Sequence, residues 1–386
     1  MHKPLRSRDV RASNENLVLS LIFSHGSASQ SSVVQQTGLK APTVFRIFSK
    51  LEEEGFIRSC PEETPGPVDR SGAERKGRRP NVYCVEPDSA YAIGVDFSRL
   101  AAAVIVVNFA NTVIHRDSIE IRRADDRESV LVVVEGLIDT AIRRSGVEPD
   151  SFLGLGVAAP GVVDIETGRV LDYRRLRGLS GYSLQDRLAQ RFNMPVYVHN
   201  NASVIAASAY HYGDALEQES LLTVLVRSGV GAALVTHGDI FLNGTTTALE
   251  LGRTTLDPQS LEGVARDADS LEQIVAERPM LERLREHYTV QSWEEADQRL
   301  TDVEVASALY RERVAIAAAI RNLHHLFHPE AVLLVTRFPI LSKVLGDAVR
   351  SALPERTVIP MVYDPVQACY GATDIVFRRF FAGGRF

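Results

Sequence analysis

The stretch VYVHNNAS, residues 196–203, decides the fold class because it joins a strand pattern to a helix pattern through a polar cluster. Residues 196–198 are all β-forming, and residues 202–212 have the composition of a helix. Open α/β sheets bind ligands where the carboxyl end of a strand meets the following helix. If a small ligand binds here, His199, Asn200 and Asn201 are the first groups to meet it, although we expect His199 to pack or to support a neighbouring contact rather than to bind the ligand directly.

Strand and helix patterns alternate on both sides of this stretch. Before it, strands are expected at residues 91–95, 102–107, 112–114 and 153–158, and helices at 128–144 and 184–191. After it, strands are expected at 221–226, 232–235 and 332–335, with one or two helices at 271–288 and single helices at 303–328, 339–353 and 365–381. Such alternation is typical of α/β domains. The fold class is therefore α/β from residue 87 onward.

The length and composition of the chain limit its class. A chain of 386 residues exceeds what one hydrophobic core organises, so two or three domains are expected. No apolar run approaches the roughly 18 residues of a membrane span, and the N-terminus does not resemble a signal peptide. Cys60, Cys84 and Cys369 lie far apart and form no CxxC pair. We therefore expect a cytoplasmic protein without disulfides, a structural zinc site or membrane contact.

The first 86 residues differ from the rest in charge and pattern. They carry 13 Lys and Arg against 10 Asp and Glu, whereas the remaining 300 carry a net charge of −9. Apolar spacing predicts a helix at 14–25, a short helix that ends at Thr37-Gly38, and a third helix at 41–54. This order predicts a helix-turn-helix, whose last helix enters the major groove of DNA. The alternative is a small helical subdomain that binds no nucleic acid.

The outward face of the third helix carries residue types that contact DNA. They are Lys40, Thr43, Arg46 and Lys50. Thr43 and Arg46 are the candidates for base edges, while the two lysines suit phosphates. Double-stranded DNA is thus the predicted partner.

Two short strands, at 56–59 and 81–85, flank a long loop and predict a wing beside the helix-turn-helix. Residues 75–80 (RKGRRP) place four cations on a glycine-containing turn of that loop. Arginines on such a turn can enter the narrow minor groove of A·T-rich DNA. Arg78 and Arg79 are therefore predicted DNA contacts, with a solvated loop as the alternative.

Short segments along nearly the whole chain resemble, in order, the ROK family of sugar-responsive repressors and sugar kinases. They are TGL at 37–39 with TVFR at 43–46, GRRP at 77–80, IGVD at 93–96, APG at 159–161, NNA at 200–202, SGVG at 228–231, ELGR at 250–253 and HPEA at 328–331. The resemblance implies a multi-domain α/β protein: an N-terminal winged helix-turn-helix followed by two lobes of the actin-like ATPase (ribonuclease-H-like) fold. It implies a DNA-binding domain at 1–86, a first lobe at 87–200 and 371–386, and a second lobe at 201–370 with the effector cleft and dimer interface.

The chain departs from the kinase branch of this family at three of four elements. A family kinase carries its general base as the aspartate of an Asn-Asp-Ala-Asn run, and Asn201 stands at that position. The segment after Asp96 lacks the glycine of the phosphate loop, and residues 335–337 (VTR) replace a double glycine near the adenosine. Only the turn at 228–231 is kept. The resemblance therefore implies a protein that is not an enzyme and needs no cofactor.

The zinc ligands of the family are missing as well. They are one histidine of a Glu-x-Gly-His motif and three nearby cysteines, whereas this chain has Arg253 at the histidine position and no cysteine at 260–267. Metal binding is therefore not expected.

The resemblance also implies where an effector binds. Asn200, Asn201 and Glu250 are expected to contact the hydroxyls of a small carbohydrate-like effector, helped by the backbone at 247–248. Arg253 allows two interpretations. Its guanidinium can bind the carboxylate or phosphate of a sugar acid or sugar phosphate, or it can pair internally with Glu250 or an acidic residue of the adjoining loop.

These features predict a DNA-binding transcriptional regulator, a repressor in the first instance, that senses a sugar or sugar derivative in a catalytically degenerate kinase-like cleft. The family implies a homodimer or a dimer of dimers, and two-fold symmetry then implies a palindromic operator. Effector binding is expected to change the angle between the lobes and so the spacing of the two heads. The alternatives are an active ATP-dependent sugar kinase and a repressor controlled by a protein partner, with a vestigial cleft.

Overall fold

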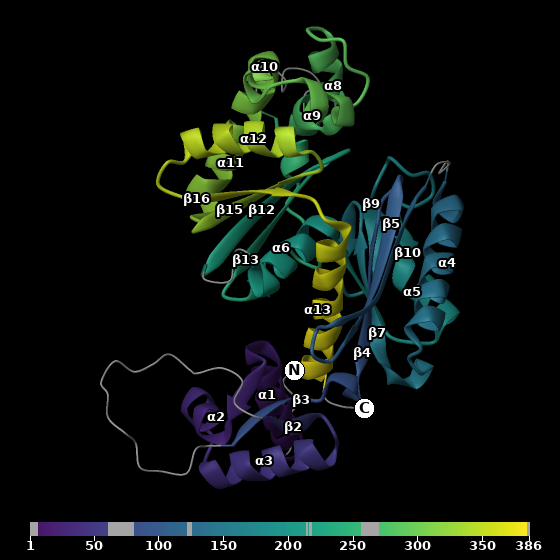
Figure 1. The fold of residues 1–386 in the computed structure, drawn as a ribbon, viewed down its shortest axis with the longest axis vertical. Coiled ribbons are helices and arrows are strands. Elements are labelled where there is room, and N and C mark those ends of the chain that lie inside the picture. The colour runs from purple at the N-terminus through teal and green to yellow at the C-terminus, as the bar shows by residue number, and fades with distance from the viewer. Residues whose placement is uncertain are drawn as a thin grey trace.

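The structure is a computed structural model that describes residues 7–60, 81–121, 126–213, 215, 218–255 and 270–383. Figure 1 shows three parts along the long axis of the molecule: a small helical head that holds the N-terminal residues, a first sheet with its helices, and a second sheet with a larger group of helices. None of the helices in these ranges is long and apolar enough to cross a membrane.

The head has the winged helix-turn-helix fold that the sequence predicts. Its elements are α1 (Ser7–His25), β1 (Ser27–Ser29), α2 (Gln30–Thr37), α3 (Ala41–Glu53), β2 (Ile57–Cys60) and β3 (Val82–Val85), with the strands in the order β1-β3-β2. Ser29 and Ser32 form a capping box that starts α2, and Gly38 ends it with a φ of 68°. β1 was not expected from the sequence, because three residues rich in serine carry no strand pattern.

The first sheet has the order β11-β7-β4-β5-β6. Its strands are β4 (Tyr91–Phe97), β5 (Ala101–Asn108), β6 (Val113–Glu120), β7 (Phe152–Ala159) and β11 (Val196–Asn200), and the 3-10 turns η1 (Pro87–Ser89) and η2 (Pro149–Ser151) precede β4 and β7. β4, β7 and β11 are parallel, and β5 and β6 are antiparallel additions. Helices α4 (Arg127–Ser145) and α5 (Leu184–Phe192) pack on one face. A small sheet, β8 (Val162–Asp164), β9 (Arg169–Asp172) and β10 (Tyr182–Ser183), follows β7.

The second sheet has the order β14-β13-β12-β15-β16. Its strands are β12 (Ser220–Val226), β13 (Val230–Thr236), β14 (Asp239–Ile240), β15 (Ala331–Thr336) and β16 (Thr357–Val362). The helices of this lobe are η3 (Leu251–Arg253), α7 (Leu271–Val275), α8 (Glu277–Arg285), α9 (Trp293–Arg299), α10 (Asp302–Ala308), α11 (Tyr310–Phe327) and α12 (Pro339–Ala352). Most of them share one core with the inner face of the sheet.

Two features of this lobe correct the sequence-based expectation. The single helix expected at 303–328 is wrong, because the backbone leaves helical geometry at Leu309 (φ −97°, ψ 29°), whose side chain is buried in the core. The resulting helices are α10 and α11. β16 was not expected at all, because Pro360 interrupts its pattern; as an edge strand it tolerates a residue without an N–H.

Helix α13 (Pro365–Gly383) covers the other face of the first sheet, and helix α6 (Asn201–Tyr212) lies between α13 and one face of the second sheet. Glycines allow their backbones to approach closely. A Cβ on Gly156 of β7 would lie 1.9 Å from the carbonyl oxygen of Ala372, and one on Gly371 would lie 2.0 Å from that of Val204. α13 is therefore held against both the first sheet and α6 by direct backbone packing.

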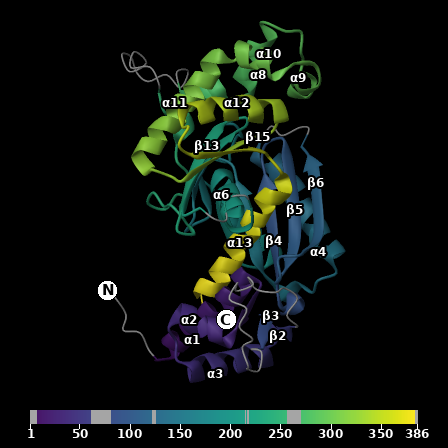
Figure 2. The same ribbon diagram turned by 60° about the vertical axis from the view of Figure 1, so that its left-hand side comes forward.

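The head is joined to the body by a group of phenylalanines that we name the aromatic joint. It consists of Phe23, Phe56, Phe109, Phe377, Phe380 and Phe381, with ring centroids 4.9 to 6.1 Å apart in the contacting pairs. One continuous apolar core contains these rings, the helices of the head and the outer face of β4 and β5. Figure 2 shows the C-terminal end of α13 directly beside the head, as Figure 1 does.

Candidate functional site

The polar end of β11 builds the first turn of α6. Asn200 caps this helix: its Oδ1 accepts from the backbone N–H of Ala202 at 2.9 Å, and its Nδ2 donates to the carbonyl of Gly161 at 2.5 Å. The cap joins α6 to the turn that follows β7. Each amide atom of Asn200 keeps one further hydrogen-bonding position, so a role toward a ligand stays a prediction.

Asn201 turns inward, and four side chains that we name the Asp96 cluster meet there: Asp96, Asn201, Arg227 and Tyr363. The Nδ2 of Asn201 donates to Oδ1 of Asp96 and, at 3.2 Å, to the carbonyl of Ala158. The hydroxyl of Tyr363 donates to Oδ2 of Asp96, and the guanidinium of Arg227 lies 4.1 Å from the centre of the Tyr363 ring. The cluster thus connects the end of β4 to residues that follow β12 and β16 in the other sheet.

The charges of the Asp96 cluster follow from burial and from mutual contact. Burial raises the pKa of Asp96, against the opposing effects of Arg227 and of the hydrogen bonds from Tyr363 and Asn201. Burial, and then the charge of Asp96, raises the pKa of Tyr363 well above its ordinary value, so its hydroxyl keeps the proton that it donates. Although burial opposes it, contact with Tyr363 and Asp96 raises the pKa of Arg227, which stays cationic.

A cavity of about 210 Å³ adjoins the Asp96 cluster. Its lining residues are Asp96, Arg227, Tyr363, Pro365, Ala101, Ala102, Ala103, Ser118, Ile119 and Glu120. The side chains of the cluster already bind one another, so no free carboxylate faces this space from Asp96. The arrangement is suited to holding the two sheets together rather than to activating a hydroxyl.

His199 is buried beside this site but is not part of it. Neither ring nitrogen has a hydrogen-bond partner in the described part of the chain. Burial, and then the charge of Arg379, lowers its pKa to about 3. The ring is therefore neutral and packed, as expected of this residue from the sequence.

Segment 241–255 of the second lobe contacts α6 and the first lobe through a row of polar contacts that we name the cleft rim. Ser203 of α6 donates to Thr247 at 2.8 Å, and Thr245 donates to Asp164 at 2.9 Å. Asp164 also accepts two backbone N–H groups, chiefly that of Thr167, and these hydrogen bonds lower its pKa. The rim therefore carries a carboxylate that stays ionised near neutral pH.

Arg253 belongs to the cleft rim. Its Nη1 lies 3.3 Å from Asp172 and 3.4 Å from Glu250, and Arg175 forms a neighbouring ion pair with Glu272. The internal pairing of Arg253 agrees with the second interpretation of this residue, with Asp172 as a partner that the sequence did not suggest. Its side chain is 54% exposed, so these ion pairs are screened by solvent.

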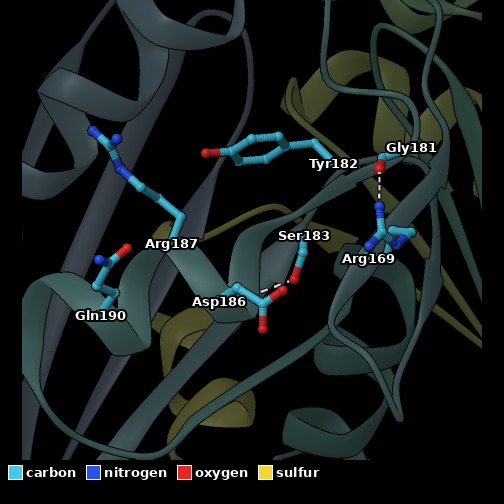
Figure 3. Close-up of a pocket in the computed structure, with 7 residues that line it drawn as sticks. All are labelled: Arg169, Gly181, Tyr182, Ser183, Asp186, Arg187 and Gln190. Carbon is cyan, nitrogen blue, oxygen red and sulfur yellow. Dashed lines mark hydrogen bonds between the residues drawn. The ribbon is translucent and has the colours of Figure 1, made fainter.

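A second hollow, of about 390 Å³, lies on the outside of the first lobe at the start of α5. Figure 3 shows its lining: Arg169, Gly181, Tyr182, Ser183, Asp186, Arg187 and Gln190. Arg187 already binds Glu135 (2.6 Å) and Glu128 (3.2 Å), and Arg169 donates to the carbonyl of Gly181. Its cations are thus used internally, and it lies apart from the residues that the sequence singled out.

The structure places the predicted DNA-binding residues on α3 in different surroundings. Lys40 and Arg46 are exposed and Thr43 is half-buried. Lys50 pairs with Glu15 of α1 at 2.7 Å and with Glu54 at 3.6 Å. Arg78 and Arg79, and the segment 260–267 that lacks the zinc-binding cysteines, lie outside the described residues. Within the described ranges, no group of three or more His, Cys, Asp or Glu is placed to hold a metal ion.

Arg227 and Tyr363 are the residues of the site that sequence reasoning missed. Arg227 directly precedes the glycine-containing turn at 228–231 that resembles the family, which was a usable signal. Tyr363 follows the unexpected strand β16, so nothing local identified it. Both reach Asp96 only through pairing of strands that are far apart in sequence.

Comparison with known proteins agrees with this architecture. The model of the ROK family matches residues 92–369, and a model described as winged helix-turn-helix DNA-binding matches residues 13–58. The xylose repressor of Caldicellulosiruptor bescii is 25% identical over 370 residues, which cover 91% of this chain and 90% of that protein.

Two solved structures show the same fold. A ROK family transcriptional regulator, a homologue of the E. coli MLC protein, superposes with a TM-score of 0.77 at 17% identity and covers 97% of both chains. A ROK family glucokinase from Streptomyces griseus, solved with glucose and AMPPNP, superposes with a TM-score of 0.60 at 17% identity and covers 74% of this chain and 99% of its own.

Proposed function

The chain belongs to the ROK family, and we propose that it is a DNA-binding transcriptional regulator, a repressor, that senses a sugar or sugar derivative. The observation that carries this proposal is the attachment of the head. Its helices share one buried core with β4, β5 and α13, so the DNA-binding domain is built into the body rather than tethered to it. A signal in the body can therefore reach the head through packed side chains.

The cleft of this regulator binds without catalysing. Asn201 stands at the position of the family's general base, and an amide cannot accept the proton of an attacking hydroxyl. Its Nδ2 instead donates to Asp96, whose other oxygen accepts from Tyr363. The position that would hold the general base in a family kinase here contributes a hydrogen-bond donor to the Asp96 cluster. This supports a protein that is not an enzyme and uses no nucleotide cofactor.

The effector meets Asn200, Asn201 and Glu250, with Arg253 behind Glu250. Because Arg253 already pairs with Glu250 and Asp172, we propose that it supports the Glu250 carboxylate rather than binding an anionic effector itself. The geometry thus favours a neutral sugar, in keeping with a relative named a xylose repressor and a structural neighbour that holds glucose.

DNA is bound by the head. Arg46 and Thr43 reach base edges, Lys40 and Lys50 bind phosphates, and Arg78 and Arg79 enter the minor groove. We propose the division into a DNA-binding domain (1–86), a first lobe (87–200 with 371–386) and a second lobe (201–370) as the units that move. A homodimer or dimer of dimers in the cytoplasm then reads a palindromic operator.

The test combines in vitro selection of duplexes by the full chain with fluorescence anisotropy. We expect a palindromic sequence to be enriched, and a neutral monosaccharide from a panel with xylose, glucose and their acids and phosphates to release it. A loss of affinity for the selected duplex in an Arg46→Ala variant shows that the head binds the DNA. Sugar-dependent ATP turnover in a coupled assay would contradict the non-enzymatic cleft. A thermal-shift panel without any stabilising sugar would instead favour control by a protein partner.

A further inference from the structure

Phe45 is a large apolar side chain on the solvent side of α3. The side chain is 61% exposed, while Val44, Ile47, Phe48 and Leu51 of the same helix are buried in the core of the head. An isolated exposed hydrophobic residue needs no special explanation. The position of this one on the helix is what gives it meaning.

The surroundings of Phe45 are those of a base-reading position. It lies in the second turn of α3, which begins at Ala41 after the glycine turn of the helix-turn-helix. The N-terminal part of such a helix contacts base edges in the major groove. Lys40 and Arg46 nearby are exposed, and neither has an ion pair within the described part of the chain, so both cations are free for the DNA backbone and bases.

We propose that Phe45 is a specificity-determining residue that reads the 5-methyl group of a thymine. This rests on the proposed DNA-binding function. A phenyl ring has no hydrogen-bonding atoms, so it can distinguish bases only through apolar contact, and the thymine methyl is the apolar group on the major-groove edges. Contact between ring and methyl also removes water from the adjacent site of Arg46, where a guanidinium binds best to a guanine.

The experiment starts from the duplex that the full wild-type chain selects in vitro. Each thymine is replaced singly by deoxyuridine, which lacks only the methyl group, and the dissociation constant is measured by fluorescence anisotropy at one fixed salt concentration. We expect a loss of about fourfold at one thymine of each half-site, the effect of removing one methyl group from apolar contact. In Phe45→Ala the same replacement has no effect. 5-Methylcytosine placed at that position restores part of the affinity of the wild-type protein and none of the affinity of Phe45→Ala.

Val132→Ala is the matched control, since it shortens another exposed apolar side chain on α4, away from the head. It keeps the wild-type response to deoxyuridine. An unchanged melting temperature of Phe45→Ala shows that the head still folds. A deoxyuridine response that persists in Phe45→Ala, or none at any thymine in the wild type, overturns this inference alone. A wild-type chain that enriches no duplex overturns the DNA-binding function and this inference with it.

Discussion

Asn201→Asp restores the carboxylate of the kinase branch, and we expect it to destabilise the protein rather than to activate it. In the wild type, the Nδ2 of Asn201 donates to Asp96 and to the carbonyl of Ala158. An aspartate offers an oxygen in its place. Two carboxylates then face each other in a buried site, and Ala158 loses its side-chain donor.

The cost follows from the bonds that are lost. A hydrogen bond to a charged acceptor contributes roughly 1.5 to 3 kcal/mol, and a buried acceptor left without a donor costs about 1 to 3 kcal/mol. We therefore expect the unfolding free energy to fall by about 3 to 5 kcal/mol at neutral pH. In the variant, repulsion adds to burial and raises the folded-state pKa of the carboxylate pair above its unfolded value.

The sign of the pH dependence is then fixed. A raised folded-state pKa contributes stability at low pH that is lost as the pH rises through that pKa. Burial already raises the pKa of Asp96 in the wild type. The stability of the wild type therefore depends on pH with the same sign but to a smaller extent. The stability difference between wild type and Asn201→Asp is therefore expected to narrow at pH 5 and widen at pH 8.

The assay is urea denaturation followed by circular dichroism at pH 5 and pH 8, with a coupled ATPase measurement beside it. Asn243→Asp, which adds the same charge on an exposed turn, is the control and is expected to leave the midpoint unchanged. Equal midpoints for Asn201→Asp and wild type at pH 8, or a difference that grows at pH 5, would refute the role assigned to the Asp96 cluster. Sugar-dependent ATP turnover would refute the claim that its partners block catalysis.

Three further substitutions test other parts of the structure. Phe377→Ala removes a fully buried ring from the aromatic joint and is expected to lower the unfolding free energy by about 3 to 5 kcal/mol in urea denaturation. Phe45→Ala is its exposed control. Equal losses in the two variants would contradict the claim that the aromatic joint stabilises the protein. Gly156→Ala places a Cβ 1.9 Å from a carbonyl of α13 and is expected to abolish folded protein, whereas Gly136→Ala, in open space on α4, is expected to gain roughly 0.5 to 1 kcal/mol. Arg253→Ala removes two solvent-screened ion pairs and is expected to change the unfolding free energy by less than about 1 kcal/mol in urea denaturation, so a larger loss would show that the cleft rim is structural.

The elements that could be predicted are those with strong local signals. The capping serine and the glycine turn of the head, and the apolar strands 91–97 and 331–336, each carry their structure in adjacent residues. The break at Leu309 could not be predicted, because a helix-compatible sequence bends there only to bury that side chain. β16 was missed for the opposite reason: its register is set by β15, while its own proline argues against a strand.

The candidate site divides in the same way. Asn201 could be located because it follows a strand and lies in a stretch that matches a known motif at residues 200 and 202 and departs from it at 201 and 203. Its partners could not, since Tyr363 lies 162 positions further along the chain and approaches Asp96 only when two separate sheets are assembled. The internal pairing of Arg253 was one of two open interpretations, and its partner Asp172, which β9 carries from the first lobe, could not be foreseen. Long-range partners decide what a polar residue does, and no local pattern encodes them.

Helix α13 limits how an effector can act on the DNA-binding head. It starts two residues after Tyr363 of the Asp96 cluster and ends in the aromatic joint, about 28 Å away at 1.5 Å per residue over 19 residues. Its backbone packs directly on glycines of the first sheet and on α6, so we infer that the first lobe, α6 and the head move as one body. We propose that the rest of the second lobe is the part left to move, with the cleft rim and the Asp96 cluster as the contacts that change. In a dimer held by second lobes, such a rotation changes the spacing of the two heads without deforming either of them.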